Sequence, residues 1–278
     1  MSGTIVVNRI LSVFKYIFIA FILFISLGPL IWVFMSSFKT NAEILSGYFF
    51  PQTFRFDNYI TAFTTSPITR MYINSIVVSV GTTVVNLVIL GMSGYAVSRF
   101  QFQFKKLIII MISIALLIPG TALMLPIHQT ISAFGMTDTR AGLILVYSGF
   151  GLAVTFYILS SYFLTVPEEM EESAYLDGAG FIRTFWSIIV PISKAGFATA
   201  AILQFLNAWN EFQFALILTR TTASRTLPMA LFFFQTQYAA DFGAMFAGTI
   251  LIIIPSIIIF IILQKQIIEG LSAGAIKG

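Results

Sequence analysis

Cysteine is absent from this 278-residue chain, and histidine occurs only once, as His128. Disulfides and thiolate metal sites are therefore excluded, and so is a cluster of several histidines around a metal. Charged residues make up only 9% of the chain, whereas a soluble domain carries about 25%. Because a folded globule of this size still needs a wetted surface, much of the surface must face lipid.

Several functional patterns are also missing. The sequence has no G-x-x-x-x-G-K-[ST] loop with which to cradle ATP phosphates, and no alternating ten-residue segments typical of a membrane barrel. Its net charge of +4 is small and scattered, which does not indicate a nucleic-acid partner. One histidine and no cysteine leave little material for a membrane enzyme. We expect no catalysis by this chain and no cofactor or metal bound to it.

Long apolar runs are what the sequence has in abundance, with 58% of its residues hydrophobic. A helix needs about 20 apolar residues to cross roughly 30 Å of hydrocarbon, and a lone strand would leave its backbone unpaired in lipid. The pattern predicts an all-α membrane protein that forms a single transmembrane domain over residues 1–278, without internal duplication. The expected spans are residues 16–38, 71–98, 107–127, 141–167, 195–219 and 242–264.

The first run has no small-x-small cleavage site after it, so we expect it to be retained as a membrane helix. Six spans would place both termini on one side. Nine of the fifteen Lys and Arg residues would lie on that side, including a cluster of Arg99, Lys105 and Lys106 in a short loop. Because short cytoplasmic loops are enriched in Lys and Arg, we expect both termini and the loop 166–194 to be cytoplasmic.

The loop 166–194 contains EEMEESAYLDGAGFIRTFWSIIVP, residues 168–191, which is too polar to span a bilayer. Pro167 suits a first helical turn, acidic residues follow where the helix dipole favours them, and Gly178 and Gly180 would end the helix. We expect a helix about 15–20 Å long, with a second helix leading from Phe181 to Pro191. The face bearing Ala174 and Gly178 could dock another protein, although an acidic start and a glycine stop also occur in ordinary helices.

A polar group interrupts the fifth expected span. Asn207 and Glu211 share a helix face, and Asn210 lies beside them. A charge inside a membrane is costly and marks a functional hypothesis. Two interpretations stay open: the three residues line a substrate pathway, or Glu211 pairs within the subunit or with a partner. Gly81, Gly91 and Gly94 are expected to allow close helix packing, and Pro119, Pro126 and Pro255 to act as hinges or merely tolerated kinks.

The loop resembles the EAA loop of ABC importer permeases. Glu172, Ser173 and Ala174 match the E-A-A triplet, Gly178 follows after three residues, and the segment from Ile188 to Pro191 matches the closing I-x-L-P. Ser173 and Val190 are the departures, and both preserve size or apolar character. GYAVSRF (94–100), FPQTFRFDNY (50–59), LNAWNEFQFAL (206–216) and EGLSAGAIKG (269–278) resemble the carbohydrate-uptake branch, especially the smaller permease subunit of maltose-type transporters.

The resemblance implies a type I importer permease in a bacterial or archaeal cytoplasmic membrane. It would form half of a pathway for a sugar, with a second and usually non-identical permease, two ATPase subunits that bind ATP and Mg²⁺, and an extracytoplasmic solute-binding protein. The tail, with Gly274, Lys277 and Gly278, would reach toward the ATPase dimer. The residues implied to contact the ATPase are Glu171, Glu172, Ala174, Asp177, Gly178, Ala179, Gly180 and Pro191.

A self-contained secondary transporter or channel is the alternative. It would favour several ionisable residues inside the membrane, but only Glu211 qualifies, and the loop 166–194 would then have no evident purpose.

Overall fold

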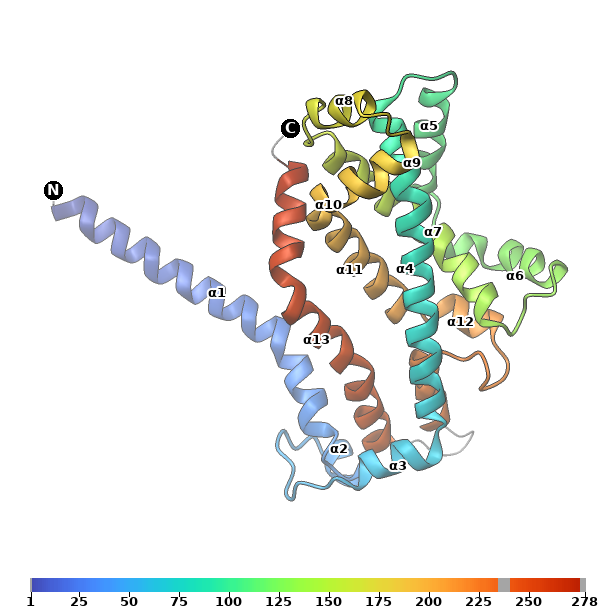
Figure 1. Ribbon diagram of the computed structural model, residues 1–278. Coiled ribbons are helices and arrows are strands. Elements are labelled where there is room, and N and C mark those ends of the chain that lie inside the picture. Colours follow the sequence, from blue (N-terminus) through green and yellow to red (C-terminus); the bar gives the residue numbers. More distant parts are fainter. Residues whose placement is uncertain (1, 235–240, 276–278) are drawn as a thin grey trace. The chain divides into compact units, whose positions relative to one another are not determined.

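The computed structural model describes the backbone of residues 2–234 and 241–275, and the side chains of residues 11–234 and 241–265. Over these residues it contains helices and loops and no strand (Figure 1), which confirms the all-α expectation. Two compact units form. The first comprises Met1–Ser66 with Leu231–Ile253, and the second comprises Pro67–Ala230 with Ile254–Gly278.

Four helices within the described part of the chain are long and apolar enough to cross a membrane, and the number rises to six if each of two bent helix pairs is one span. The four match the first, second, fourth and sixth expected spans. They are α1 (Ser2–Ser36), α4 (Ile68–Arg99), α7 (Arg140–Phe163) and α13 (Phe242–Ala275).

The third expected span is broken rather than continuous. Helix α5 (Lys105–Ala115) ends early, and the chain resumes as η1 (Gly120–Leu123) and α6 (Met124–Ala133) after a bend of 96°. Pro119 lies at the break with extended backbone angles, φ −67° and ψ 127°. Because a proline disfavours helical geometry at the residue before it, Pro119 accounts for the break.

The fifth expected span is also divided. A segment of short turns, α9 (Phe181–Thr184), the π-helical turn η2 (Phe185–Ile189) and α10 (Val190–Ile192), precedes α11 (Lys194–Asn210) with a bend of 84°. Helix α11 then ends at Asn210, and a short helix α12 (Gln213–Leu218) follows. The residues expected at 195–219 thus form two helices.

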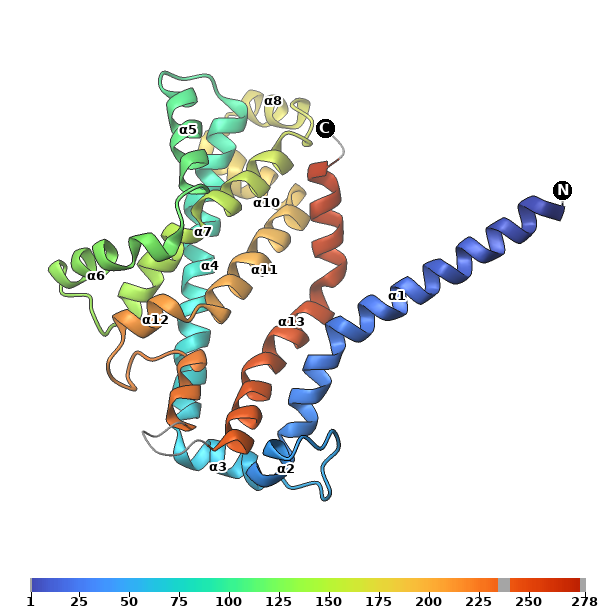
Figure 2. The ribbon, with the colours of Figure 1, turned by 180° about the vertical axis from the view of Figure 1, so that it is seen from behind.

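Helices α4, α7 and α11 form the core of the second unit and lie side by side in Figures 1 and 2. Small residues let them approach. A Cβ on Gly94 would lie 3.5 Å from the Ser160 amide nitrogen of α7, and one on Gly81 would lie 2.8 Å from Ile144. The packing role expected for the glycines of α4 is therefore confirmed at these positions.

The first unit contains the short helices α2 (Asn41–Leu45) and α3 (Asp57–Thr65). Thr40 and Glu43 form a capping box at the start of α2. Lys39 is buried just before it, where its Nζ donates to the Tyr48 carbonyl oxygen at 2.6 Å. The 3-10 helix η3 (Leu227–Phe234) contains the point in the sequence at which the second unit ends and the first resumes.

Candidate functional site

The loop 166–194 forms a short helix, α8 (Glu169–Leu176), with acidic residues in its first turn. It ends as the sequence predicts, because Gly178 adopts a left-handed φ of 78° and the Ala179 N–H donates to the Ala174 carbonyl oxygen at 2.9 Å. The helix starts after Glu168 rather than at Pro167. Its eight residues span about 12 Å, which corrects the expected 15–20 Å.

One side of α8 is buried against α4. Glu171 and Ala174 are the buried residues of this helix. A Glu171 carboxylate oxygen lies 2.6 Å from Nε of Arg99, and each of these side chains is only 7% exposed. The Tyr95 hydroxyl donates to the other Glu171 oxygen at 2.8 Å. Arg99 also donates to the Val166 carbonyl oxygen, so side chains at the end of α4 hold both the start of the loop and α8.

Aromatic packing attaches the second half of the loop 166–194 to the same end of α4. The Tyr95 ring stacks on Phe181 with centroids 5.2 Å apart, and lies 5.7 Å from the Phe185 ring. Phe163 of α7 joins this cluster. Tyr95 is completely buried. It therefore contacts the helices on both sides of Gly178 at once.

Sequence reasoning missed Tyr95 and Arg99. Both lie in the stretch GYAVSRF, where the sequence shows only a family resemblance and, at Arg99, a charge that marks topology. Its partner Glu171 lies 72 positions away, and no local pattern indicates that pairing. The only signal in the sequence is that this stretch ends a span on the same expected side of the membrane as the acidic loop 166–194.

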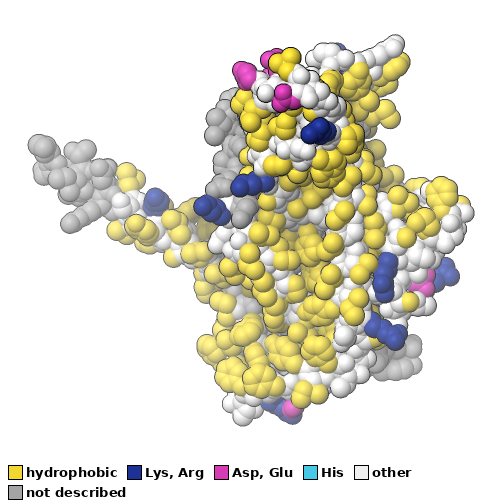
Figure 3. All heavy atoms as spheres, viewed as in Figure 1, with side chains coloured by type: hydrophobic (Ala, Val, Ile, Leu, Met, Phe, Trp, Pro, Cys, Tyr) yellow, Lys and Arg dark blue, Asp and Glu magenta, His cyan; other side chains and the backbone are white. Residues whose placement is uncertain are grey.

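The other side of α8 is free. Among the residues predicted to contact an ATPase, Glu172, Asp177, Gly178, Gly180 and Pro191 are exposed, Ala179 is half-buried, and Glu171 and Ala174 face into this chain. Leu176 is 89% exposed, and Met170 and Tyr175 are exposed beside it. Figure 3 shows acidic and apolar side chains together on this part of the surface. The sequence motif gives no signal for Leu176, because it lies among the three unspecified residues between Ala174 and Gly178.

A polar cavity of about 260 Å³ lies between α7 and the segment where α11 ends. Asn207 and Glu211 line it, so the structure brings these two predicted residues together. Asn210 is not among the lining residues, and its amide donates to the Leu206 carbonyl oxygen of its own helix at 2.8 Å. The remaining lining residues are Gly120, Tyr147, Phe150, Gln204, Ala208, Gln213 and Phe214.

Glu211 does not lie within a continuous helix, which corrects its expected place inside the fifth span. Its two carboxylate oxygens accept the backbone N–H groups of Phe214 and Ala215 at 2.8 and 3.1 Å. These N–H groups start α12, where a helix favours negative charge. The carboxylate therefore has a structural partner within this chain, and it still borders the cavity.

The wall of this cavity continues into a buried polar contact among three helices. Gln204 of α11 is buried next to Asn86 of α4, and a Cβ on Gly151 of α7 would lie only 1.7 Å from the Gln204 side-chain oxygen. Any larger residue at position 151 would displace these amides. Sequence reasoning did not single out these residues.

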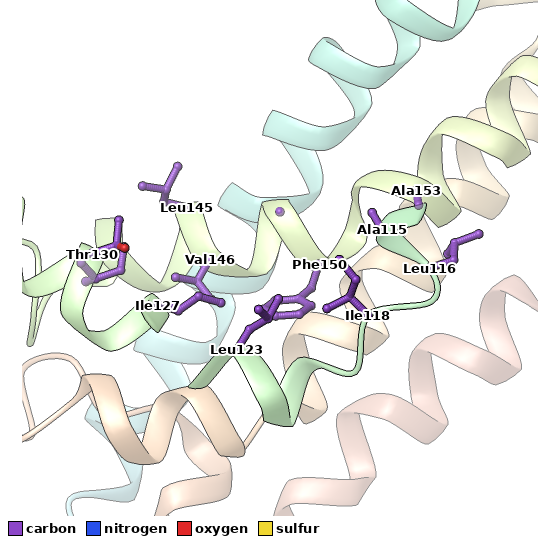
Figure 4. Close-up of a pocket in the computed structure, with 12 residues that line it drawn as sticks. Ala115, Leu116, Ile118, Leu123, Ile127, Thr130, Leu145, Val146, Phe150 and Ala153 are labelled. Carbon is purple, nitrogen blue, oxygen red and sulfur yellow. The ribbon is translucent and has the colours of Figure 1, made fainter. Parts of the chain in front are cut away.

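An apolar groove of about 370 Å³ adjoins the polar cavity. Figure 4 shows Phe150 of α7 directed into it, between Leu123 and Ile118 of the broken third span. Phe150 also lines the polar cavity, so a change in its position would affect both spaces.

The predicted tail contacts fall at the edge of the described chain. Gly274 lies in α13, and Lys277 and Gly278 lie outside the described residues. Within the described residues there is no group of three or more His, Cys, Asp and Glu side chains that could hold a metal ion.

Residues 87–272 match a family model described as the binding-protein-dependent transport system inner membrane component. The trehalose transport system permease protein SugB of Mycobacterium tuberculosis is 38% identical over 91% of this chain and 93% of its own. The diacetylchitobiose uptake system permease protein NgcG of Streptomyces coelicolor is 33% identical over 90% of this chain and 83% of its own.

The fold has a counterpart among solved structures as well. A chain in the crystal structure of a bacterial ABC transporter involved in the import of the acidic polysaccharide alginate superposes with a TM-score of 0.81, at 23% identity, over 93% of this chain and 96% of that one. This likeness confirms the fold of an ABC importer permease. The family match covers the loop 166–194, the polar cavity and most of the helices around them. The chain therefore belongs to the inner membrane components of binding-protein-dependent transport systems and is a multi-pass membrane protein.

Proposed function

We propose that this chain is a permease subunit of an ATP-driven importer of a carbohydrate. The relatives named for trehalose and diacetylchitobiose, and the structural neighbour that imports alginate, all concern saccharides. The chain would form half of the pathway beside a second, non-identical permease. Two ATPase subunits would bind ATP and Mg²⁺, and a solute-binding protein would deliver the sugar from outside.

The observation that carries the coupling part of this proposal is the two-sided character of α8. Its buried side is tied to α4 through Glu171 and Arg99, and its free side presents Leu176 beside acidic groups. Met170 and Tyr175 are exposed beside Leu176, and an exposed apolar patch with polar residues around it is typical of a protein contact. The free side would therefore dock an ATPase subunit, and the buried side would transmit its movement to α4.

This arrangement adds a route to the one suggested by the sequence. The sequence alone connects the loop to the fifth span through Pro191. Tyr95 and Arg99 connect it directly to α4 as well. Closure of the ATPase subunits would then move α4 and α11 together around the polar cavity, which is a form of alternating access by rocking helices.

The cavity lined by Asn207 and Glu211 would contribute to the sugar pathway. Its amide and carboxylate groups suit a hydroxyl-rich ligand. Because both carboxylate oxygens of Glu211 already accept N–H groups of α12, Asn207 is the better candidate for direct contact. A proton relay of the kind used by a secondary transporter has no support from this carboxylate.

The coupling proposal is tested by Gly178→Arg in the complex reconstituted in vesicles, with ATP hydrolysis and sugar uptake measured together. Gly178 has open space around it in this chain, so an added side chain would project toward the ATPase. Sugar uptake should fall about tenfold, which corresponds to roughly 1.4 kcal/mol, while the complex still hydrolyses ATP.

Gly47→Arg is the matched control. Gly47 has the same φ of 78° and the same open surroundings, so the change imposes a similar backbone strain in the first unit, which does not contain α8. Its uptake should remain near that of the unmodified complex. Normal uptake in the Gly178→Arg complex would contradict the coupling role.

A further inference from the structure

A second polar pocket, of about 210 Å³, lies at the opposite end of α4 from the loop 166–194. Two arginines meet there. Arg70 lies in the first turn of α4, and Arg140 is the first residue of α7. Figure 3 shows basic side chains, with an acidic side chain among them, over the lower end of α4 and beside α12. The other lining residues are Ile73, Asn74, Thr222 and Ala223.

The electrostatics of this pocket call for an anion. Each guanidinium lies at a helix N-terminus, which already carries partial positive charge and disfavours a cation. Neither Arg70 nor Arg140 forms an ion pair with any acidic side chain in the part of the chain that the structure describes. The pocket is thus bordered by two guanidinium groups, each from the first turn of a helix.

Asp138, the acidic residue nearest to Arg140 in the sequence, already accepts hydrogen bonds from other residues. Its carboxylate accepts the backbone N–H groups of Arg220 and Thr221 at 2.8 and 3.0 Å, and the hydroxyl groups of Thr221 and Ser224. Burial alone would raise the pKa of Asp138, but these hydrogen bonds outweigh it and hold its pKa well below the ordinary range. Asp138 stays ionised and fixes the loop that forms one wall of the pocket.

Asn74 fixes the same wall of the pocket through its side-chain amide. Its side chain is 1% exposed, and its amide nitrogen donates to the carbonyl oxygens of Thr222 and Arg225 at 3.2 and 2.8 Å. Its buried side-chain oxygen has no hydrogen-bond partner within the described residues. The pocket therefore offers two forked guanidinium donors held against a fixed wall. A carboxylate, such as that of an acidic residue of a polypeptide, matches these donors.

The location identifies the polypeptide. Arg70 and Arg99 are separated by 29 positions of one helix, or about 44 Å at 1.5 Å per residue, which exceeds the roughly 30 Å of hydrocarbon. If the loop at the Arg99 end faces the ATPase, as in the proposed function on which this inference rests, the pocket faces the outside. A lipid headgroup fits less well, because only Ile73 and Ala223 give the pocket an apolar wall.

We propose that this pocket, with Arg70 and Arg140, binds an acidic side chain of the solute-binding protein when that protein docks on the transporter. Each guanidinium can donate two parallel hydrogen bonds to a carboxylate. The contact would set the affinity and speed of docking rather than the chemistry of ATP hydrolysis.

The test uses the reconstituted complex in phosphatidylcholine vesicles, with ATP hydrolysis measured against the concentration of sugar-loaded binding protein. In Arg70→Gln, Arg140→Gln and the double variant, the half-saturating concentration should rise, by about tenfold or more in the double variant. The maximal rate should stay unchanged. Lys106→Gln, which removes one exposed charge at the other end of the unit, is the charge-matched control and should not shift the curve.

Two further results distinguish the explanations. A charge-reversed Arg140→Glu complex should regain affinity when one acidic residue of the binding protein is changed to lysine, and a full scan of its acidic surface without rescue would overturn the proposal. If the effect of the variants appears only when phosphatidylglycerol is added, the pocket binds lipid and the proposal is wrong. If the binding protein fails to stimulate even the unmodified complex, it is the proposed function that fails.

Discussion

At the scale of single residues, Asp138 is the clearest case of a side chain whose charge organises its surroundings. It adopts a left-handed φ of 59°, and its carboxylate gathers four donors from residues 220–224. A carboxylate with several N–H and O–H donors is stabilised in its ionised form. The loop before α7 and the loop after α12 therefore depend on one ionised group.

Because the pKa of Asp138 is lower in the folded chain than in the unfolded one, its contribution to stability has a defined pH range. It is fully present above the unfolded pKa of about 3.9, and it is lost as the pH falls through the lower folded pKa. Asp138→Asn should destabilise the detergent-purified protein by about 1–2 kcal/mol at pH 7, measured by thermal unfolding. The difference from the unmodified protein should shrink only below about pH 4.

Asparagine tolerates a left-handed φ, so this variant isolates the charge. Asp138→Ala should lose more stability, because alanine disfavours that backbone conformation. Equal stability of the Asn variant and the unmodified protein at pH 7 would refute the role assigned to the charge.

At the scale of secondary-structure elements, the attachment of α8 to α4 is the feature with the most consequence. An eight-residue helix is too short to be stable alone, so its tertiary contacts must hold it. Glu171 and Arg99 provide a buried ion pair, and Tyr95 adds a hydrogen bond and an aromatic surface.

Removing one partner of this pair should leave the other buried and unpaired, at a cost of about 3–5 kcal/mol. Glu171→Gln or Arg99→Gln should therefore speed amide hydrogen exchange over residues 168–180 while α7 keeps its protection. The double variant should lose less than the sum of the single variants, by about 1 kcal/mol or more.

Arg55 and Asp57 supply the comparison, since they form an ion pair whose side chains are 50% and 65% exposed. Such exposed pairs contribute about 0–1 kcal/mol, so Arg55→Gln should change little. Strict additivity at Glu171 and Arg99 would mean that the pair does not hold α8.

The elements also show what sequence can and cannot predict. The long spans were predictable, because an uninterrupted apolar run has only one satisfactory structure in lipid. The stop of α8 was predictable because Gly178 supplies a left-handed conformation. The break at Pro119 had a local signal, but the proline alone does not distinguish a kink from a bend of 96°.

The break at Glu211 and the tie to Tyr95 had weaker signals. Glu211 looked like an interruption of a span, whereas it starts a new helix by accepting two backbone N–H groups. Tyr95 and Glu171 are 76 positions apart. Such pairings follow from how helices pack, and a single sequence does not encode them in any local pattern.

At the scale of the whole molecule, orientation in the membrane is the property on which the other assignments depend. The chain has no cysteine, so single cysteines can report on accessibility without background. Ser173 in α8 and Ala223 at the opposite end of the same unit are both exposed. In sealed right-side-out vesicles, a membrane-impermeant maleimide should label Ala223→Cys and spare Ser173→Cys.

The same approach tests the pathway. Asn207→Cys in the cavity should react at a rate that changes with the nucleotide state of the complex, and bound sugar should slow it. Asn210→Cys is the control, because this residue is exposed but does not line the cavity. Labelling of Ser173→Cys from outside would reverse the orientation, and a sugar effect confined to position 210 would remove Asn207 from the pathway.

Helix α4 runs without interruption over 32 residues. Tyr95 and Arg99 near its last turn grip the loop with α8, and Arg70 and Asn74 near its first turns shape the pocket at the far end. A continuous helix of this length moves as one body, so a displacement of one end also displaces the other end. If the affinity of a ligand at one end of α4 depends on the tilt of this helix, a ligand bound at the other end changes that affinity. Thermodynamic reciprocity requires the two ligands to change each other's affinity by the same factor.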